Sequence, residues 1–188
     1  MFKWILVAGL GLVLVLAAIA SDQFLVFGSD DLPIMENPRI EVSKSERKLE
    51  LFDGDKSIKV YKIALGFSPE GDKEIEGDGK TPEGEFYIFT KNPKSSFYLS
   101  LGVSYPSIDD AKRGLEKELI TQEEHVAIVS AINEKRTPPQ NTALGGEIYI
   151  HGHGNLTDWT AGCIAMTNSD IKELFDALEV RTPVTVNP

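Results

Sequence analysis

Ile148-Tyr149-Ile150-His151-Gly152-His153, followed by Thr160-Ala161-Gly162-Cys163, carries most of the information in this chain. The apolar run that ends at His151 indicates a short strand, which would hold the imidazole at a fixed place. Cys163 follows His151 by 12 residues, across a loop rich in Gly, Asn, Thr and Asp. Because Cys163 is the only cysteine, it cannot form an intramolecular disulfide. The pattern therefore predicts a nucleophilic thiol with a histidine as its base.

The residues around this pair suggest supporting roles. A cysteine attacks as thiolate, and a histidine near neutral pH is suited to take its proton. Gly162 leaves backbone N–H groups free to face a developing oxyanion. His153 lies on the same face as His151 if the strand continues, so we expect it to support His151 or to contact substrate. Trp159 is expected to form a wall of the cleft.

A zinc site is the alternative interpretation of the same residues. His151, His153, Asp158 and Cys163 are all possible ligands. The sequence has no second cysteine, no Cys-x-x-Cys and no His-Glu-x-x-His pattern. We therefore predict no metal and no diffusible cofactor, because acyl transfer by a thiol needs neither.

Composition limits the partners of the chain. Its 188 residues carry a formal charge of −10, from 19 basic and 29 acidic residues. Such a surface repels nucleic acid, and no basic stripe offsets it. The length suits one domain of ordinary size, which we expect to be a monomer.

The N-terminal segment is typical of an exported protein. Lys3 precedes an uncharged run of 17 residues, Trp4 to Ala20, which ends in Ala18-Ile19-Ala20. Residues 1–27 are predicted to be a signal peptide or an N-terminal membrane anchor, and residues 28–38 a linker. We expect a periplasmic or cell-envelope protein, held in the inner membrane if the segment is not cleaved. An unpaired thiol in an oxidising compartment suggests a chemical role.

The rest of the chain predicts a mainly β domain over residues 39–188, a β-sandwich or barrel-like fold with a helical insertion and a short C-terminal helix. Short alternating or apolar runs bounded by turn residues predict the strands. They are expected at 39–42, 48–52, 57–66, 84–89, 97–103, 147–151, 162–166 and 184–186. The C-terminal helix is expected at 170–178, capped by Asn168 or Ser169.

The insertion covers residues 107–136 and has two helix-start patterns. Ser107 is followed by Asp110, and Thr121 by Glu124, each at capping-box spacing. Val126, Val129 and Ile132 are predicted to share one face of the second helix. We expect the insertion to be a lid over the cleft.

Three segments resemble the L,D-transpeptidase catalytic domain of the YkuD type. Ile150-His151-Gly152 resembles the family's His-Gly strand, and Thr160-Ala161-Gly162-Cys163-Ile164 its [Ser/Thr]-x-Gly-Cys motif. Upstream, Gly77-Asp78-Gly79-Lys80-Thr81-Pro82-Glu83-Gly84 is similar to the family's Gly-Asp-x-x-Thr-Pro-x-Gly segment. The three segments occur in the family's order.

The resemblance implies a reaction on peptidoglycan stem peptides. Cys163 would attack the carbonyl of the third stem residue, D-alanine would leave, and an acyl-enzyme would form. His151 would activate the thiol, with its other ring nitrogen held by the Gly152 carbonyl, and the Gly162 and Cys163 amides would form the oxyanion hole. Substrate contacts are expected at His153, Trp159, Thr160 and Ala161. An amine on a neighbouring stem, or water, would take the acyl group.

Ala165 is a departure from the family pattern, since many members carry Arg two residues after the cysteine. The His-to-Cys loop is also shorter, and Gly-Cys-x-Ala-Met resembles a branch that includes a hydrolase of peptidoglycan-linked lipoprotein. Two other functions therefore stand beside the transpeptidase: a thiol amidase or L,D-carboxypeptidase of the same fold, and a catalytically silent wall-binding module.

Overall fold

The computed structural model describes residues 32–188 of the chain. The predicted signal peptide or anchor, residues 1–27, lies outside them, as do residues 28–31 of the predicted linker. Among the described residues, no helix is long and apolar enough to cross a membrane. The end of the predicted linker belongs to the domain, because the Glu36 and Asn37 N–H groups donate to the Asp53 carboxylate at 3.1 and 2.7 Å.

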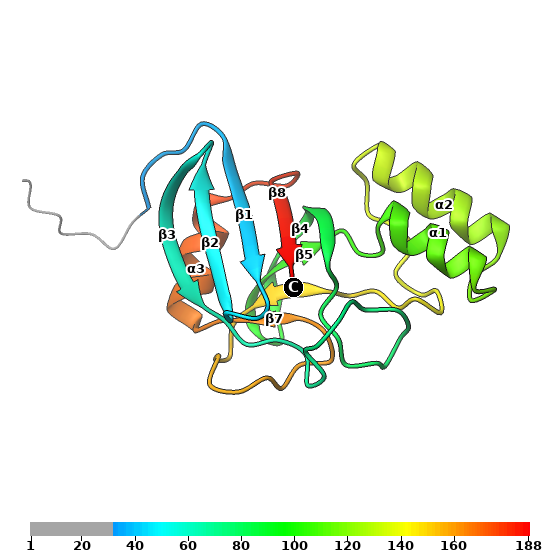
Figure 1. The fold of residues 1–188 in the computed structure, drawn as a ribbon. Coiled ribbons are helices and arrows are strands. Elements are labelled where there is room, and N and C mark those ends of the chain that lie inside the picture. Colours follow the sequence, from blue (N-terminus) through cyan, green and yellow to red (C-terminus); the bar gives the residue numbers. More distant parts are fainter. Residues whose placement is uncertain (1–31) are drawn as a thin grey trace, which may run out of the picture. The chain divides into compact units, whose positions relative to one another are not determined.

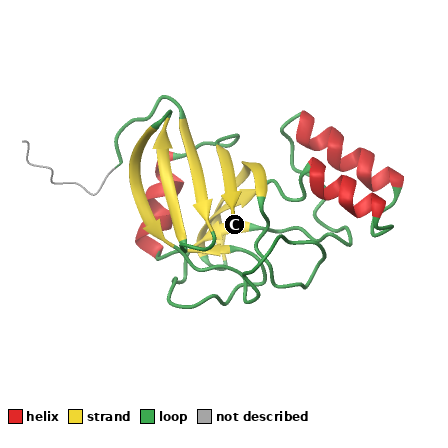
Figure 2. Ribbon diagram, viewed as in Figure 1, coloured by secondary structure: helices red, strands yellow, loops and turns green. Residues whose placement is uncertain are grey.

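Residues 32–188 form a curled eight-stranded sheet with three helices (Figures 1 and 2). The strand order is β3-β2-β1-β8-β4-β5-β6-β7, and β1–β8 and β6–β7 are the parallel pairs. The strands are β1 (Pro38–Ser43), β2 (Lys48–Asp53), β3 (Lys56–Lys62), β4 (Gly84–Ser95), β5 (Tyr98–Val103), β6 (Tyr149–His151), β7 (Ile164–Ala165) and β8 (Pro183–Asn187). The predicted mainly β, barrel-like fold is confirmed.

Alternating apolar residues build the core on one face of this sheet. Ile40 and Val42 of β1 lie opposite Leu51 and Leu49 of β2, and all four are buried. Val184 of β8 and the central residues of β4, β5 and β6 continue the same layer. Because side chains alternate across a strand, this register gives the curled sheet one apolar interior and a polar outer face.

The predicted strand over residues 57–66 is too long. β3 ends at Lys62, and the chain then makes two isolated bridges, from Ala64 to Ala165 and from Gly66 to Thr160. The segment that was expected to extend a hairpin therefore pairs instead with the residues on either side of Cys163. This long-range pairing has no signature in a local pattern of alternation.

Three helices accompany the sheet: α1 (Ile108–Glu116), α2 (Gln122–Asn133) and α3 (Asn168–Ala177). Both predicted capping boxes in the insertion are present, with Ser107 and Thr121 as the N-caps. α1 and α2 lie side by side as a hairpin at the far side of the domain from β3 (Figure 1). The C-terminal helix begins earlier than predicted, because Thr167 is its N-cap and accepts the Asp170 N–H.

The predicted shared face of α2 is only partly buried: Ile132 packs against the core and Val129 is half-buried. Val126 is 56% exposed, whereas Ile128 and Ala131 are buried. α2 packs mainly on α1 rather than on the sheet. Its buried residues therefore form a narrow face that differs from the predicted one.

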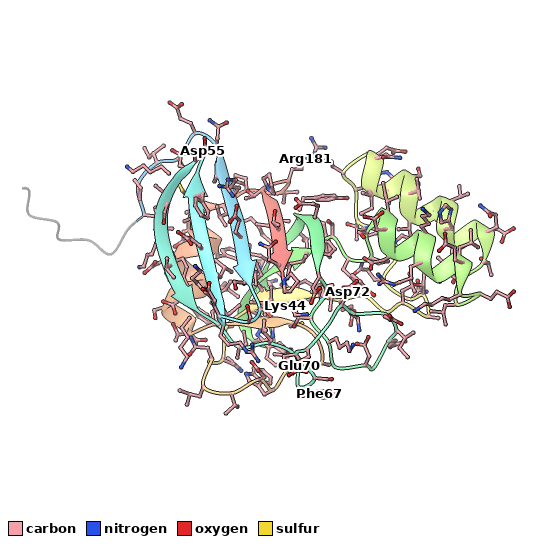
Figure 3. All side chains as sticks on the ribbon, viewed as in Figure 1. Lys44, Asp55, Phe67, Glu70, Asp72 and Arg181 are labelled. Atoms are coloured by element: carbon pink, nitrogen blue, oxygen red, sulfur yellow. The ribbon has the colours of Figure 1, made fainter. Side chains whose placement is uncertain are left out.

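A buried lysine holds the long loop between β3 and β4. Lys44 Nζ, just after β1, donates to Gly71 O, Thr81 O and the Glu83 carboxylate at 2.6–2.9 Å. Figure 3 shows Lys44 in the middle of the domain, above the loop that carries Phe67 and Glu70. Because the lysine is buried with every N–H matched to an acceptor, it ties this loop firmly to the sheet.

Candidate active site

Cys163 lies in the turn that leads into β7, beside the start of β6. The parallel register pairs Ile150 with Ile164, which places Cys163 next to Tyr149. The Tyr149 N–H donates to the Cys163 sulfur at 3.4 Å, and the thiol donates to Glu147 O at 3.4 Å. Cys163 as a residue is half-buried. It is therefore held at the edge of the sheet by backbone groups of the segment that also carries His151.

Thr160 builds the turn that presents the sulfur. Its hydroxyl donates to Cys163 O at 2.7 Å and accepts the Gly162 N–H at 3.1 Å. The side chain is buried, with 4% exposure. Thr160 was predicted to contact substrate, but its hydroxyl is occupied within the turn. The same bond engages the Gly162 amide, which was predicted to face an oxyanion.

Gly162 connects the two motifs that lie far apart in the sequence. Its φ is +139°, and a Cβ there would meet Lys80 O at 2.7 Å. Gly66 also faces this point, because a Cβ on Gly66 would lie 2.1 Å from Gly79 O and 3.2 Å from the Gly162 Cα. The Gly-Asp-Gly-Lys-Thr-Pro segment therefore packs directly against the cysteine turn. Only glycine leaves room for this close backbone approach.

His151, the last residue of β6, is 2% exposed. Its Nδ1 lies 2.7 Å from Gly152 O, the contact that the resemblance implies. A carbonyl oxygen only accepts, so we assign the proton to Nδ1, which leaves Nε2 as an acceptor. The ring stacks on Phe97 with centroids 4.5 Å apart and meets the edge of Trp159 at 5.5 Å. These contacts fix both the tautomer and the plane of the imidazole.

Burial shifts both titratable groups away from their charged forms. Burial lowers the pKa of His151, and His153 lowers it further, while the Gly152 contact opposes them. Burial raises the pKa of the Cys163 thiol; the Tyr149 N–H and the Lys73 cation oppose this rise, and Glu147 adds to it. At neutral pH the resting pair is a neutral imidazole and a thiol, the protonation state from which a base can remove the thiol proton.

Cys163 and His151 are close along the sheet without being directly bonded. Tyr149, whose backbone N–H contacts the sulfur, lies two residues before His151 on β6. That separation is about 6.6 Å along a strand. Within residues 32–188, the contacts of the sulfur go to backbone groups and none goes to the imidazole.

Two hollows lie next to this pair, one lined by Cys163 and the other by residues that contact the His151 ring. The first, of ≈ 290 Å³, has Cys163 in its wall. It is also lined by Lys73, Glu76, Gln140, Glu147 and Ala161, with the glycines at 77, 145 and 146. The second, of ≈ 410 Å³, is lined by Phe97, His153, Leu156, Thr157 and Trp159. Phe97 and Trp159 also hold the His151 ring, so this hollow lies on the histidine side.

The predicted substrate residues are thus divided between two places. Ala161 lies in the hollow of Cys163, and His153 and Trp159 lie in the hollow next to His151. Sequence reasoning missed Lys73, which lies just before the Gly77–Gly84 segment and far in the sequence from His151 and Cys163. It also missed the Tyr149 N–H, because a backbone group carries no residue-type signal.

The arrangement does not assemble the four residues of the zinc alternative. Asp158 is held by Arg47, whose Nε and guanidinium NH₂ donate to the carboxylate at 3.0 and 2.8 Å, and it also accepts the Leu65 N–H at 2.8 Å. Its role is to fix the loop before the cysteine turn. In the part of the chain that the structure describes, no three His, Cys, Asp or Glu side chains are grouped to hold a metal ion.

The comparison with known families agrees with this geometry. A model of the YkuD L,D-transpeptidase catalytic domain matches residues 37–186. The chain belongs to the YkuD family. The match includes both the cysteine turn and the Gly-Asp-Gly-Lys-Thr-Pro loop. Comparison with curated proteins gives no match.

Solved structures share the YkuD fold. The helical cell shape determining protein Pgp2 from Campylobacter jejuni (K307A mutant) is 23% identical with a TM-score of 0.54, covering 84% of this chain and 49% of that one. Bd1075 from Bdellovibrio bacteriovorus is 24% identical with a TM-score of 0.53, covering 83% and 51%. The chain thus spans about half the length of these proteins. At this identity the likeness concerns the fold alone.

Proposed function

We propose that the protein is a cysteine-dependent acyl transferase of the L,D-transpeptidase type, acting on peptidoglycan stem peptides. The observation that carries the proposal is the Cys163 turn: one thiol, set in the wall of a hollow beside the strand whose last residue is an oriented, neutral imidazole. Membership of the YkuD family supports the choice of substrate.

The first half-reaction forms a thioester. His151 Nε2 takes the thiol proton, after rotation of the Cys163 side chain or through one bridging water, and Sγ bonds to the carbonyl carbon of the third stem residue. The C–N bond to D-alanine then breaks, and the imidazolium gives its proton to the leaving amine. In the second half-reaction, an amine or water attacks the thioester and restores the thiol.

The developing oxyanion needs backbone donors near the sulfur. Of the two predicted amides, that of Gly162 already donates to Thr160 Oγ1. We therefore assign the Cys163 N–H as the principal donor, with the Gly162 N–H joining it only if the turn relaxes. The Tyr149 N–H contacts the sulfur itself and stabilises the thiolate.

The reaction locates the protein outside the cytoplasm, where stem peptides are cross-linked. Export through residues 1–27 is part of this proposal, and so is attachment to the membrane if that segment stays in place. The two hollows offer separate entries for the stem that donates the acyl group and for the group that accepts it.

Product analysis tests the proposal. The protein is incubated with disaccharide tetrapeptides, and the mixture is separated by chromatography with mass detection. Transpeptidation predicts D-alanine release together with cross-linked dimers, whereas the carboxypeptidase alternative gives free tripeptide without dimers. If wild-type protein and C163A both leave the tetrapeptide intact, the wall-binding alternative is favoured.

A further inference from the structure

Lys73 is a buried cation that the reaction above leaves without a role. It is 2% exposed and lines the same hollow as Cys163. Among the described residues that line this hollow, it is the one positive side chain, and Glu76 and Glu147 are the acidic ones. A buried lysine is costly unless its charge is matched, so its presence here needs an explanation.

Asp78 matches this charge and fixes the ammonium in place. Lys73 Nζ donates to Asp78 Oδ1 at 2.9 Å and to Ile75 O at 2.9 Å. The carboxylate also accepts the backbone N–H groups of Glu74, Ile75 and Lys80 at 2.8–3.1 Å. The aspartate of the Gly-Asp-Gly-Lys-Thr-Pro segment therefore organises the whole loop around the lysine, and its charge is shared among four donors.

The helical insertion supports the same loop from outside. Arg113 of α1 donates to Asp72 Oδ2 at 2.8 Å and to Lys73 O at 2.7 Å, while Asp110 accepts from it at 2.6 Å. Lys117, one turn further along α1, forms an exposed ion pair with Glu74 at 2.7 Å. The insertion is thus bonded to the wall of the hollow that carries Lys73, rather than standing over it as a free lid.

We propose that Lys73 is a positioning residue for the Cys163 sulfur: its ammonium provides the positive field in which the thiolate forms, and Arg113 of the insertion keeps it in place. Of the charged groups that line the hollow, Glu147 opposes the thiolate and Lys73 favours it; Glu76 lines the same hollow, and the neutral His151 lies further along β6. The inference rests on the proposed function only in taking Cys163 as the nucleophile.

The charges agree with this role in sign. The Lys73 cation lowers the pKa of the Cys163 thiol, against the larger effect of burial. Without the cation, burial and Glu147 raise the pKa of the thiol further, so the thiolate fraction at neutral pH falls. Because Asp78 shares the lysine's charge, the effect is moderate rather than complete.

Alkylation of the single cysteine by iodoacetamide tests this directly. The rate of Cys163 modification is followed by mass spectrometry between pH 5 and pH 10 for wild type, K73M, K73R, R113Q and K117A. We expect the midpoint of the K73M profile to rise by about half a pH unit or more, with about a threefold slower rate at pH 7. R113Q should shift in the same direction by less, and K73R and K117A should match wild type.

The control variant K117A separates the effect of holding Lys73 in place from a general loss of stability in the loop. K117A removes an ion pair between α1 and the same loop, but an exposed one, so a shift there as large as that of R113Q would contradict the proposal. A folded K73M whose profile superposes on wild type would overturn it. If K73M does not fold, an unshifted R113Q overturns it equally. None of these results depends on turnover, so a failure of the proposed reaction is seen separately, in the product analysis.

Discussion

The Tyr149 backbone N–H and the Cys163 sulfur are 3.4 Å apart, and this contact connects the fold to the chemistry. It exists because β6 and β7 run parallel with Ile150 opposite Ile164. The strand that presents the imidazole at its end thus also orients the thiol at its start. A register shift of one residue would turn the sulfur away from β6.

His151 is expected to be essential for turnover. We predict that H151Q lowers kcat for D-alanine release by about 10²–10⁴-fold, the usual contribution of a general base. The glutamine keeps a polar side chain in the stacked position on Phe97 but cannot take the proton. Steady-state kinetics measure the loss. H125Q, a substitution of the α2 histidine, is the matched control, and an equal loss there would contradict the assignment.

The activity should depend on pH through the same residue. The pKa of His151 lies below its ordinary value of 6.5, chiefly because the ring is buried. The imidazole therefore stays neutral, and competent as a base, down to a pH below 6.5, and kcat/KM should fall only as the pH drops through that lowered pKa. The unfolded chain takes up this proton first, so stability also declines as the pH falls below about 6.5. An acid limb centred above 6.5 would count against this account.

Gly162 is predicted to tolerate no side chain. G162A places a methyl group 2.7 Å from Lys80 O at a φ of +139°, and strain of this kind costs about 1–3 kcal/mol of unfolding free energy. Urea denaturation measures the cost. G54A, at a φ of +56° with nothing within 4 Å, is the control and should cost only the left-handed backbone penalty of about 1 kcal/mol. Equal losses would show that the contact with the Lys80 loop has no effect.

Thr160 is expected to act through the turn rather than through substrate. T160V keeps the shape but leaves the Gly162 N–H and the Cys163 carbonyl without their shared hydroxyl. Loss of such a buried partner destabilises by about 1–3 kcal/mol. T157V, on the exposed part of the same loop, should be neutral. If T160V left stability unchanged but raised KM, the result would support the predicted substrate contact of Thr160 instead.

The sequence predicted local features of the chain better than it predicted their surroundings. His151, Cys163 and the capping boxes of α1 and α2 have local signals: an apolar run, a Gly-Cys turn, and Ser or Thr three residues before an acid. The fold class followed from alternation in the same way. These features depend on neighbours in the chain, which one sequence displays.

Long-range pairing could not be predicted in this way. Ala64 and Gly66 bridge to residues beside Cys163, and Lys73 reaches the same hollow from a loop whose composition indicates only turns. The burial of Ile128 and Ala131 in α2 could not be predicted, because α2 packs on α1, a partner that its own periodicity does not identify. Thr160 and Gly162 were assigned to substrate and oxyanion, but the fold uses their polar groups to close the turn.

Mass spectrometry of the intact protein mixed with a disaccharide tetrapeptide tests the central claim most directly. The account predicts an adduct with the mass of the acyl group that remains after D-alanine leaves. The adduct should map to Cys163, be absent in C163A and be slow to form in H151Q. Release of D-alanine with no covalent species on Cys163, or at an undiminished rate in C163A, would contradict the account.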